Sequence, residues 1–464
     1  MDFPYQIPDS HIAVFNIISR AGATIDQPVY VVGGYVRDYY LNRLEETDPD
    51  LDFVTLGSGI SLAKQVQKLI PGSHLSVFKQ FGTAMVKTDQ LELEFVGARK
   101  ESYRKNSRKP LVEDGNLQDD QLRRDLTINA LSWSLNKNGF GNLIDPFGGI
   151  KDLTNRLIRT PIDPLKTFDD DPLRMLRAIR FATQLKFDIE QSTYDAIQKM
   201  APRLEIISKE RIITELNKIV MTDKPSKGFA HLFNTGLLKQ FFPQMHQLQG
   251  VKVKNGQSHK DNFWHTLQVL DNVVEYGGHI WLRWAAIMHD IAKPPTQRFD
   301  NTKWTKGIFR QLGLPLDDRM RYVRKLVRLH LRPIALVKDE VSDSAIRRLI
   351  VEAGDDIDDL MTLCRADITS KNEYKVERFQ KNFTRVEKKI KEVEEKDRLR
   401  NWKNPVSGEE IMEALSIPPS KVIGDIKKAI KEAILNGEIE NSHDAAFDYL
   451  MENKTQFLSL DNSK

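Results

Sequence analysis

The sequence predicts an α+β protein in which a head with a mixed sheet is followed by an all-helical body. Short β-branched runs separated by Gly and Pro occur in the first third of the 464 residues, as expected for strands. From about residue 169 onward the strand patterns nearly disappear, and amphipathic helical patterns continue to the C-terminus. The chain is several times longer than an ordinary domain, so we expect several domains.

Four strands are predicted in the head. They are expected at residues 29–32, 51–55, 83–86 and 91–96. Helical patterns lie between them over residues 35–44 and 61–70, and Pro71 and Gly72 end the second helix. In the body, a charged stretch over residues 371–403 predicts one long helix with a single apolar seam. This helix either docks by that seam or contacts RNA through its Lys and Arg residues.

Composition excludes several classes of protein. Hydrophobic residues make up 40% of the chain and charged residues 29%, which is typical of a globular protein. The net charge of +4 permits a phosphate-rich partner without indicating one. Cys364 is the only cysteine, so we expect no internal disulfide, no Cys-rich zinc site, and a reducing, cytoplasmic location. The sequence contains no run of about 18 apolar residues and no secretion signal, which predicts no association with a membrane.

A glycine pair follows the first predicted strand. Gly33 and Gly34 stand between that strand and a helical pattern that contains Arg37. Paired glycines let backbone N–H groups approach a ligand, and the N-terminal end of a helix favours an anion. Arg37 could hold phosphate oxygens with two parallel hydrogen bonds. A turn with a purely structural role gives the same pattern, so the motif alone does not distinguish a phosphate-binding turn from a structural one.

Two aspartates accompany the next strand. Asp50 and Asp52 are two residues apart, so their carboxylates share one face of a strand. Neighbouring carboxylates repel each other and together attract a hard cation such as Mg²⁺. A phosphate cradle followed by such a pair suits two-metal nucleotidyl transfer, whereas an acidic turn would explain the pair alone. Glu94, two strands further on, is the candidate third carboxylate, although a solvent-facing strand predicts the same pattern.

Two charged helical patterns follow. RRDLTINA at residues 123–130 comes after a polar loop over 99–121, and its two arginines are expected to enter an apolar helix, as a charge cluster or as triphosphate contacts. In DDPLRMLRAIRF at 170–181, polar residues recur every third position: Asp171, Arg174, Arg177 and Arg180. An Asp that accepts and an Arg that donates hydrogen bonds match the base edge of cytosine or adenine and reject guanine and uracil. The alternative is a ladder of ion pairs along the helix.

In this order, the motifs resemble the class II tRNA nucleotidyltransferase and poly(A) polymerase family, a branch of the DNA polymerase beta superfamily. GGYVRD, DLD, RRDLTINA and DDPLRMLRAIRF carry the resemblance, which covers residues 28–245 well. It implies a polymerase-beta-like nucleotidyltransferase head. It also implies a flexible, specificity-switching loop over 99–121. Asp170 stands where the family usually has Glu, so we assign it only a helix-capping role.

The same resemblance implies roles for individual residues. It implies that Asp50 and Asp52 hold Mg²⁺, with Glu94 as a further catalytic candidate. The nucleotide would be bound by Gly33, Gly34, Arg37, Arg124, Asp171, Arg174, Arg177 and Arg180. Among these, Asp171 and Arg174 would read the base.

A second constellation lies in the helical body. It consists of His265, His289, Asp290 and Asp367. This pattern resembles the HD metal-dependent phosphohydrolase superfamily, in which imidazoles and carboxylates bind a metal ion that activates water. Residues 291–320 contain no His, where that superfamily usually has a further cluster. We therefore expect either a second divalent metal site or a helical scaffold with packed histidines.

The predicted organisation has four parts. These are a nucleotidyltransferase head over 1–160, a helical nucleotide-selecting neck over 161–250, an HD-like domain over 251–370 and a helical tail over 371–464. The tail resembles the segment that grips the tRNA elbow. Its candidate phosphate contacts, which ordinary surface lysines explain equally well, are Lys421, Lys427, Lys428 and Lys431.

The predicted function is addition of CCA to tRNA 3′ ends from CTP and ATP with Mg²⁺, without a nucleic-acid template. Within the same class, an A-adding enzyme, a CC-adding enzyme and a poly(A) polymerase share every motif. From other classes, an HD-type phosphohydrolase and a non-catalytic RNA-binding protein remain as alternatives, and the intact Asp50 and Asp52 pair argues against the latter. The sequence leaves the oligomeric state open.

Overall fold

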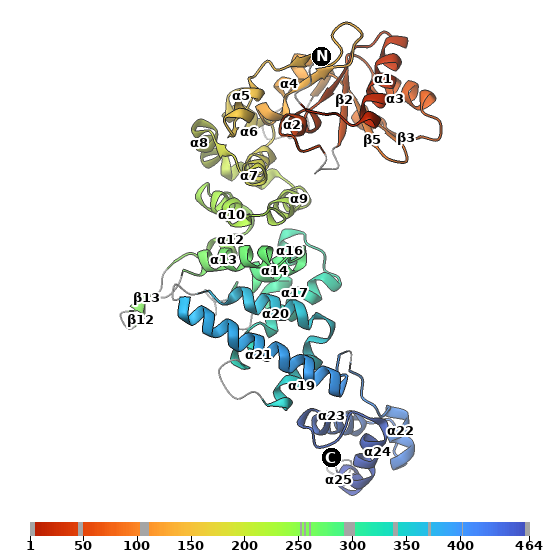
Figure 1. Ribbon diagram of the computed structural model, residues 1–464, viewed down its shortest axis with the longest axis vertical. Helices are drawn as coiled ribbons and strands as arrows, with labels where there is room; N and C mark the ends of the chain where they lie inside the picture. The colour runs from red at the N-terminus through yellow and green to blue at the C-terminus, as the bar shows by residue number, and fades with distance from the viewer. Residues whose placement is uncertain are drawn as a thin grey trace. The chain divides into compact units, whose positions relative to one another are not determined.

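The structure, a computed structural model, divides into two compact units. They comprise Met1–His246 and Gln247–Lys464 (Figure 1). The residues described are 5–44, 50–102, 111–250, 253–254, 257–258, 261–291, 302–336, 342–369, 373–400 and 402–459. A sheet-containing head in the first unit and a helical second unit confirm the predicted α+β class. The finer division into four parts remains a prediction.

A seven-stranded mixed sheet forms the centre of the first unit. Its strand order is β3-β4-β5-β2-β1-β8-β9. The strands are β1 (Val29–Val32), β2 (Leu51–Thr55), β3 (His74–Phe78), β4 (Thr83–Lys87), β5 (Glu92–Gly97), β8 (Ser132–Ser134) and β9 (Leu143–Ile144). Only β2 and β5 pair in parallel; the other neighbours in this sheet are antiparallel. The four predicted strands are confirmed to within one residue at each end.

Helices cover one face of this sheet. α1 (Asp9–Thr24) packs against α3 (Gly59–Leu69), and α3 in turn packs against β3, β4 and β5 (Figure 1). The buried face of α3 carries Leu62, Ala63 and Val66, and the Ser58 side chain caps its first turn. α2 (Gly34–Tyr40) is shorter than the helix predicted over 35–44 and follows β1 directly. These helices leave the other face of the β3-β4-β5-β2 portion for the site.

The segment over 99–121, which was predicted as a polar loop, contains regular secondary structure. It contains a hairpin of β6 (Arg99–Ser102) and β7 (Leu111–Asp114), followed by α4 (Leu117–Leu122), which a capping box begins at Asn116. Residues 103–110 of the expected flexible segment lie outside the described residues. The helix predicted after Arg123 was wrong. The two arginines follow α4, and the apolar residues after them form the 3-10 turn η2 (Thr127–Asn129) and β8.

A bundle of helices completes the first unit. They are α5 (Gly149–Thr154), α6 (Pro164–Asp170), α7 (Leu173–Leu185), α8 (Gln191–Met200), α9 (Lys209–Val220), α10 (Pro225–Asn234), α11 (Leu237–Phe241) and α12 (Pro243–His246), with the 3-10 helix η3 (Ala201–Ile206) and a strand pair of β10 (Leu157–Ile158) and β11 (Asp188–Ile189). α7 packs against α9 and α10. Its predicted apolar face is buried, with Leu176 and Ile179 fully so. The opposite, polar stripe of α7 therefore remains for contacts with other elements.

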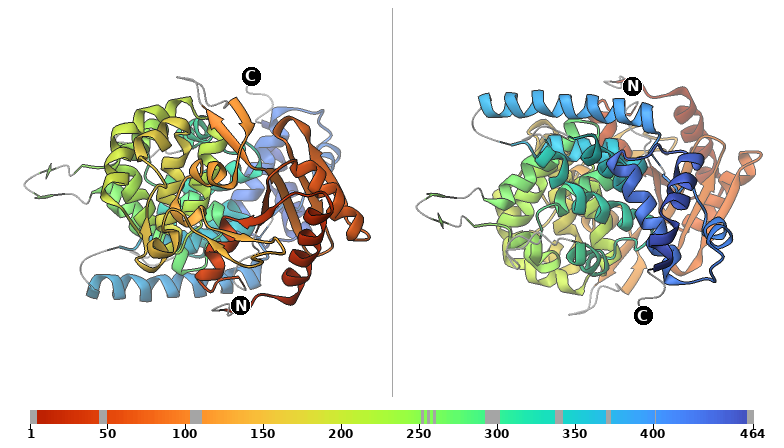
Figure 2. Two further views of the ribbon diagram at one scale, coloured as in Figure 1. Left: turned by 90° about the horizontal axis from the view of Figure 1, so that it is seen from above. Right: turned by 90° about the horizontal axis from the view of Figure 1, so that it is seen from below.

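In the described residues, the second unit is helical apart from one short hairpin of β12 (Val253–Lys254) and β13 (Gln257–Ser258). Its described helices are α13 (Asn262–Glu275), α14 (Ile280–Met288), α16 (Thr302–Leu312), α17 (Asp318–Leu329), α18 (Leu331–Leu336), α19 (Asp343–Ala353), α20 (Ile357–Asp367), α21 (Glu373–Asp397), α22 (Gly408–Leu415), α23 (Lys421–Asn436), α24 (His443–Glu452) and α25 (Lys454–Ser459), with the 3-10 turn η4 (Gly354–Asp356). Figure 2 shows α21 as one straight helix, as predicted. Four seam residues are buried: Phe383, Val386, Ile390 and Val393. None of the described helices could span a membrane.

Candidate active site

The glycine turn after β1 is shaped around an arginine. Gly33 has φ +75° and precedes α2, and a Cβ at this position would lie 2.8 Å from Nη1 of Arg124. Only glycine therefore allows both this backbone conformation and the close approach of the guanidinium. The Gly33 N–H donates to the Leu131 carbonyl at 2.9 Å, which ties the turn to the start of β8. Gly34 begins α2.

A buried aspartate holds Arg124 in place. The Oδ2 atom of Asp120 lies 3.2 and 3.3 Å from Nη2 and Nε of Arg124, and its Oδ1 atom accepts from Arg123. Burial raises the pKa of Asp120, but Arg124 and Arg123 outweigh it, so the pKa lies below its ordinary value. Asp120 is therefore an ionised anchor. Sequence reasoning missed this residue, for which the four-residue spacing to Arg124 was the available signal.

Arg37 is buried and already bound. Its Nε and Nη2 atoms donate to the Asp38 carboxylate at 2.9 and 2.7 Å, and Nη1 donates to Oδ1 of Asn129 at 2.7 Å. The guanidinium also lies 4.8 Å from the centre of the Phe181 ring, a favourable cation–π distance. Three of its five N–H donors are thus engaged, so only the rest are available to a phosphate without rearrangement.

Asn129 joins these cations to the rest of the site. Besides accepting from Arg37, it donates through Nδ2 to Oδ1 of Asp125 at 3.0 Å, and its backbone carbonyl accepts from Arg124 at 3.2 Å. Asp125 also accepts from Nε of Arg177 at 2.5 Å. Burial raises the pKa of Asp125, but Arg177 and Asn129 outweigh it and hold the pKa well below its usual range. Asn129 and Asp125 therefore connect the glycine turn to α7.

Three carboxylates gather where β2 begins. Asp52 on β2 lies opposite Glu94 on β5 in parallel register, and Asp50 directly precedes β2. Burial raises the pKa of Asp52 to about 6; Arg124 opposes this shift, whereas Glu94 and Asp50 reinforce it. The carboxylates therefore lie near enough to repel one another, and Asp50 and Glu94 are open to solvent. Such a set of hard oxygen donors beside a bound arginine fits a divalent cation.

Asp171 joins two helices at the start of α7. Its Oδ2 atom lies 2.8 Å from Nη2 of Arg211 on α9, and its Oδ1 atom accepts from the Leu173 N–H at 3.1 Å. Asp171 thus contacts the first residue of α7, whereas Asp170, to which we assigned a helix-capping role, is the last residue of α6. Sequence reasoning missed Arg211, because nothing local links it to a residue so far away in the chain.

The arginines of the α7 stripe also reach other elements. Arg174 is buried, and it donates to the carbonyls of Thr167 at 3.2 Å and Arg123 at 2.5 Å. The ion pairs of the other two are Arg177 with Asp125 and Arg180 with Glu215, both at 2.5 Å. The alternative of an ion-pair ladder along α7 is therefore wrong for this helix. The stripe instead fixes α7 against the head and against α9.

The four predicted residues of the second site come together in the second unit. His265 on α13 lies 2.9 Å from Oδ1 of Asp367 at the end of α20, measured from Nε2. His289 follows α14, and its Nε2 atom lies 3.3 Å from Asp290 and 3.6 Å from Asp367. Ligand atoms of His265, His289 and Asp290 all lie within 4.8 Å of one another. This mixed imidazole and carboxylate set fits a divalent metal ion.

A further histidine that sequence reasoning left out joins this cluster. The ring of His330, which follows α17, lies 5.5 Å from the ring of His289, and its Nε2 atom lies 4.0 Å from Oδ1 of Asp290. Nδ1 of His330 contacts the Val327 carbonyl at 2.7 Å, as Nδ1 of His289 contacts Ala286. These backbone contacts turn both Nε2 atoms toward the cluster.

The two inner histidines differ in protonation. Burial lowers the pKa of His330 to about 4, and the neighbouring His289 adds to this shift. Burial also disfavours charge on His289, but Asp290 and Asp367 outweigh it and raise the pKa of His289 to about 9. At neutral pH His330 thus presents a neutral imidazole, the form that binds metals.

Comparison with known proteins matches three family models to separate parts of the chain. The family model described as the poly A polymerase head domain matches residues 29–159. A model described as the probable RNA and SrmB-binding site of polymerase A matches 186–248, and the HD domain model matches 262–372. The first unit therefore contains one segment that matches the poly A polymerase head domain and one helical segment that matches the second model. These matches agree with the resemblance to the class II tRNA nucleotidyltransferase and poly(A) polymerase family, and to the HD superfamily, that the sequence motifs indicated.

Individual relatives match to different extents. An A-adding tRNA nucleotidyltransferase of Aquifex aeolicus is 32% identical over 64% of this chain, which spans only 36% of that relative. An A-adding enzyme of Deinococcus radiodurans and a CCA-adding enzyme of Bacillus licheniformis are each 28% identical, over 89% and 91% of this chain and 93% of each relative.

Solved structures show the same fold. The CCA-adding enzyme of Bacillus stearothermophilus in complex with CTP matches with a TM-score of 0.69, at 22% identity over 97% of this chain and 99% of that one. The Thermotoga maritima CCA-adding enzyme complexed with tRNA matches with a TM-score of 0.64, at 21% identity over 97% of both chains. At such identities these matches establish the fold.

Proposed function

We propose that this chain adds CCA to the 3′ ends of tRNA from CTP and ATP, without a nucleic-acid template, and releases pyrophosphate. One observation carries the proposal. The three carboxylates of Asp50, Asp52 and Glu94 lie near one another, beside the glycine turn that Arg124 approaches closely. The names of relatives that share most of the chain's length, which add A or CCA to tRNA, support tRNA as the substrate. A cytoplasmic location remains the prediction from the single cysteine.

The chain's own residues divide the work. Gly33, Gly34 and Arg124, with Arg37 behind them, would bind the triphosphate, because backbone N–H groups and guanidiniums favour phosphate oxygens. Asp50 and Asp52, supported by Glu94, would hold Mg²⁺. Magnesium bound there would lower the pKa of the attacking 3′-hydroxyl and stabilise the pyrophosphate.

Base selection is assigned to the start of α7. Asp171 is half-buried and offers acceptor oxygens, and Arg174 lies one turn further along the helix. Arg177 and Arg180 complete the nucleotide site by keeping α7 against Asp125 and Glu215. A base would then meet side chains whose positions ion pairs already fix, which favours selection by hydrogen bonding.

The test uses tRNA transcripts that end at the discriminator base. We expect labelled CTP and ATP to extend them by CCA, read by sequencing the 3′ ends, and we expect Asp50→Asn to abolish extension while tRNA binding persists. Asp89→Asn, which changes an exposed aspartate of the same unit, is the control. Extension of Asp50→Asn at near wild-type rate would overturn the metal assignment. Addition of only A, only CC or a long A tract would identify the corresponding relative instead.

A second activity is proposed for the HD domain because His265, His289, Asp290 and Asp367 form one buried cluster. We propose that they hold a second divalent metal ion and that the domain hydrolyses a phosphoester. Phosphate release that persists in Asp50→Asn but stops in His289→Ala would support this. Equal phosphate release by wild type and His289→Ala would leave the cluster as a scaffold.

A further inference from the structure

A row of side chains crosses the sheet through the carboxylates. Strand register aligns Ser76 on β3, Met85 on β4, Glu94 on β5 and Asp52 on β2 as successive partners. Because partners in register point to the same face of a sheet, all four side chains share one face. The opposite face is covered by α1 and α3, where Phe53 stacks on Phe95 and meets Phe15.

The shared face is partly open on the β4 side of the carboxylates. Glu94 is exposed, and Met85 and Ser76 are half-buried. Phe78, at the end of the edge strand β3, is 44% exposed, and its register partner is Thr83, two residues before Met85. The Met85 thioether therefore lies next to the candidate catalytic group, and Phe78 lies further along the same face, among polar side chains that include the Lys87 and Glu92 ion pair.

The in-line geometry of nucleotidyl transfer indicates which part of the substrate would lie against this surface. The attacking oxygen and the leaving pyrophosphate lie on opposite sides of the phosphorus atom. In the sheet, β1 and its glycine turn lie on one side of β2, and β5 and β4 lie on the other. Since Gly33 and Arg124 would bind the triphosphate, the 3′-hydroxyl of the RNA must approach across Glu94 from the β4 side.

We propose that Met85 forms the surface on which the 3′-terminal base of the RNA stacks. This inference rests on the proposed function and adds a binding site for the RNA end. The terminal base changes with every addition, from the discriminator to C and then to C again, so a hydrogen-bonding contact would reject some intermediates. A flexible, polarisable thioether accepts any heterocycle face, because every base offers one.

The test compares two primers that end in CC, one of which lacks the base of its last nucleotide. For the normal primer, Met85→Ala should raise KM about threefold to tenfold and leave the KM for ATP unchanged. For the abasic primer, whose KM is already high, Met85→Ala should raise KM by less than about twofold. Met85→Leu keeps the volume and should stay within about twofold of wild type on both primers.

Met221→Ala is the matched control, because Met221 is 46% exposed and follows α9. An equal rise of KM on both primers, or none on the normal primer, overturns the stacking proposal while a wild type that extends tRNA keeps the proposed function. A wild type that extends neither primer overturns both. Thermal melting of each variant excludes a folding defect as the cause, and Met85→Leu keeps the comparison available if Met85→Ala melts early.

Discussion

At the scale of single residues, the charges around the site are held by partners that lie both near and far away in the sequence. Asp125 receives hydrogen bonds from Arg177, Asn129 and its neighbour Leu126. The Asp171 carboxylate accepts a hydrogen bond from Arg211, and the Asp120 carboxylate accepts one from Arg124. The pKa values of Asp120 and Asp125 are thereby held below their ordinary value, and all three carboxylates are fixed in direction, which is what a site that positions a nucleotide requires.

The first prediction concerns Asp125→Asn. The ordinary pKa is 3.8 and the folded pKa lies below it, so the ion pair with Arg177 stabilises the fold fully above about pH 4 and progressively less as the pH falls further. Because Arg177 is partly exposed, we expect a loss of about 2 kcal/mol at pH 7 and a melting temperature lower by roughly 4–8 °C. Calorimetry between pH 7 and 3 should show the difference from wild type shrinking below about pH 4. Asp89→Asn is the control, and a difference independent of pH would contradict this account.

The second prediction concerns Asp171→Ala. Loss of the acceptor should relax base choice, lowering the preference for CTP over UTP by about tenfold to a hundredfold, while triphosphate binding changes less. Competition among four labelled nucleotides measures this. Asp169→Ala is the matched control, since the Asp169 carboxylate pairs with Arg203 and not with Arg211. Unchanged selectivity would remove Asp171 from base reading.

At the scale of elements, sequence patterns predicted those helices and strands whose formation depends on the residues within them. The strands with β-branched runs and the apolar face of α7 were predicted nearly to the residue, and the long helix α21 was predicted as one helix but ends at Asp397, before the expected residue 403. β3 and β8 were not, because HLSVF is short and half-exposed and SWS carries polar residues that are buried only by tertiary contacts. The helix expected after Arg124 was wrong for the same reason, since tertiary packing buries its apolar residues in another conformation. Arg211, Glu215 and His330 had no local signal at all.

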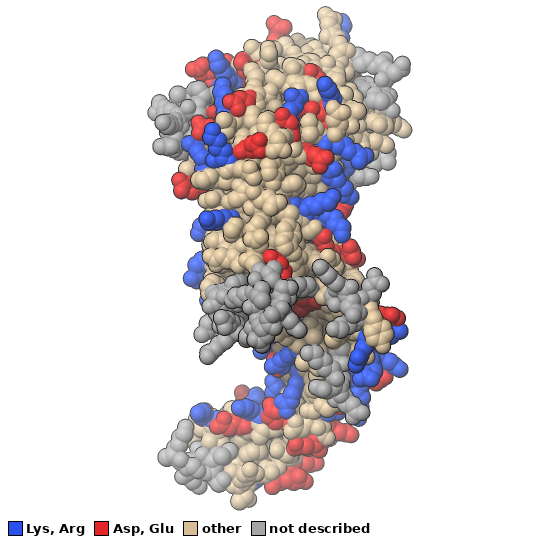
Figure 3. Space-filling model, turned by 90° about the vertical axis from the view of Figure 1, so that its left-hand side faces the viewer, with Lys and Arg blue, Asp and Glu red and all other residues tan. Residues whose placement is uncertain are grey.

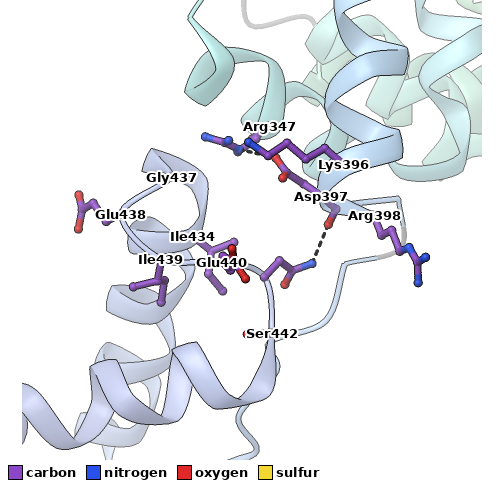
Figure 4. Close-up of a pocket in the computed structure, with 11 residues that line it drawn as sticks. Arg347, Lys396, Asp397, Arg398, Ile434, Gly437, Glu438, Ile439, Glu440 and Ser442 are labelled. Atoms are coloured by element: carbon purple, nitrogen blue, oxygen red, sulfur yellow. Dashed lines mark hydrogen bonds and ion pairs between the residues drawn. The ribbon is translucent and has the colours of Figure 1, made fainter.

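A cleft in the second unit supplies the third prediction, at the scale of the α21–α23 junction. Figure 4 shows Arg347 and Asp397 beside Gly437 in a cleft of about 470 Å³. Nε of Arg347 donates to Asp397 at 2.7 Å, and a Cβ on Gly437, which has φ +78°, would lie 2.5 Å from Nη1 of Arg347. Gly437→Ala should therefore displace this buried ion pair in addition to straining the backbone.

The matched variant is Gly277→Ala. Gly277 has φ +77°, and a Cβ there would meet no atom within 4 Å, so the substitution incurs only the backbone cost of about 1 kcal/mol. We expect Gly437→Ala to lose about 2–3 kcal/mol, because it also disturbs a buried ion pair. Denaturant unfolding followed by tryptophan fluorescence measures both. Equal losses would show that Arg347 moves aside freely.

At the scale of the whole molecule, the net charge is small. On the face that Figure 3 shows, basic and acidic side chains are interspersed, which agrees with the net charge of +4. RNA binding must then depend on local contacts. The exposed lysines of α23, Lys421 and Lys428, are the candidates that the structure leaves accessible, whereas Lys431 lies over the Trp402 ring.

The fourth prediction is a salt dependence. The double variant Lys421→Gln, Lys428→Gln should weaken tRNA binding and reduce the slope of log affinity against log salt by about 0.7 per lost phosphate contact. Filter binding at several salt concentrations measures this slope. Lys64 is exposed on α3, the helix that covers the other face of the sheet, so Lys64→Gln should leave this slope unchanged. An unaltered slope in the double variant would assign these lysines to the ordinary surface.

Four of the arginines around the glycine turn and on α7 are each paired with a carboxylate. Arg37 is matched by Asp38, Arg124 by Asp120, Arg177 by Asp125 and Arg180 by Glu215. A nucleoside triphosphate brings several negative charges into this balanced surrounding, next to carboxylates that repel it. The substrate must therefore arrive together with its own compensating cations, so nucleotide affinity should vanish in a chelator even though every arginine remains in place.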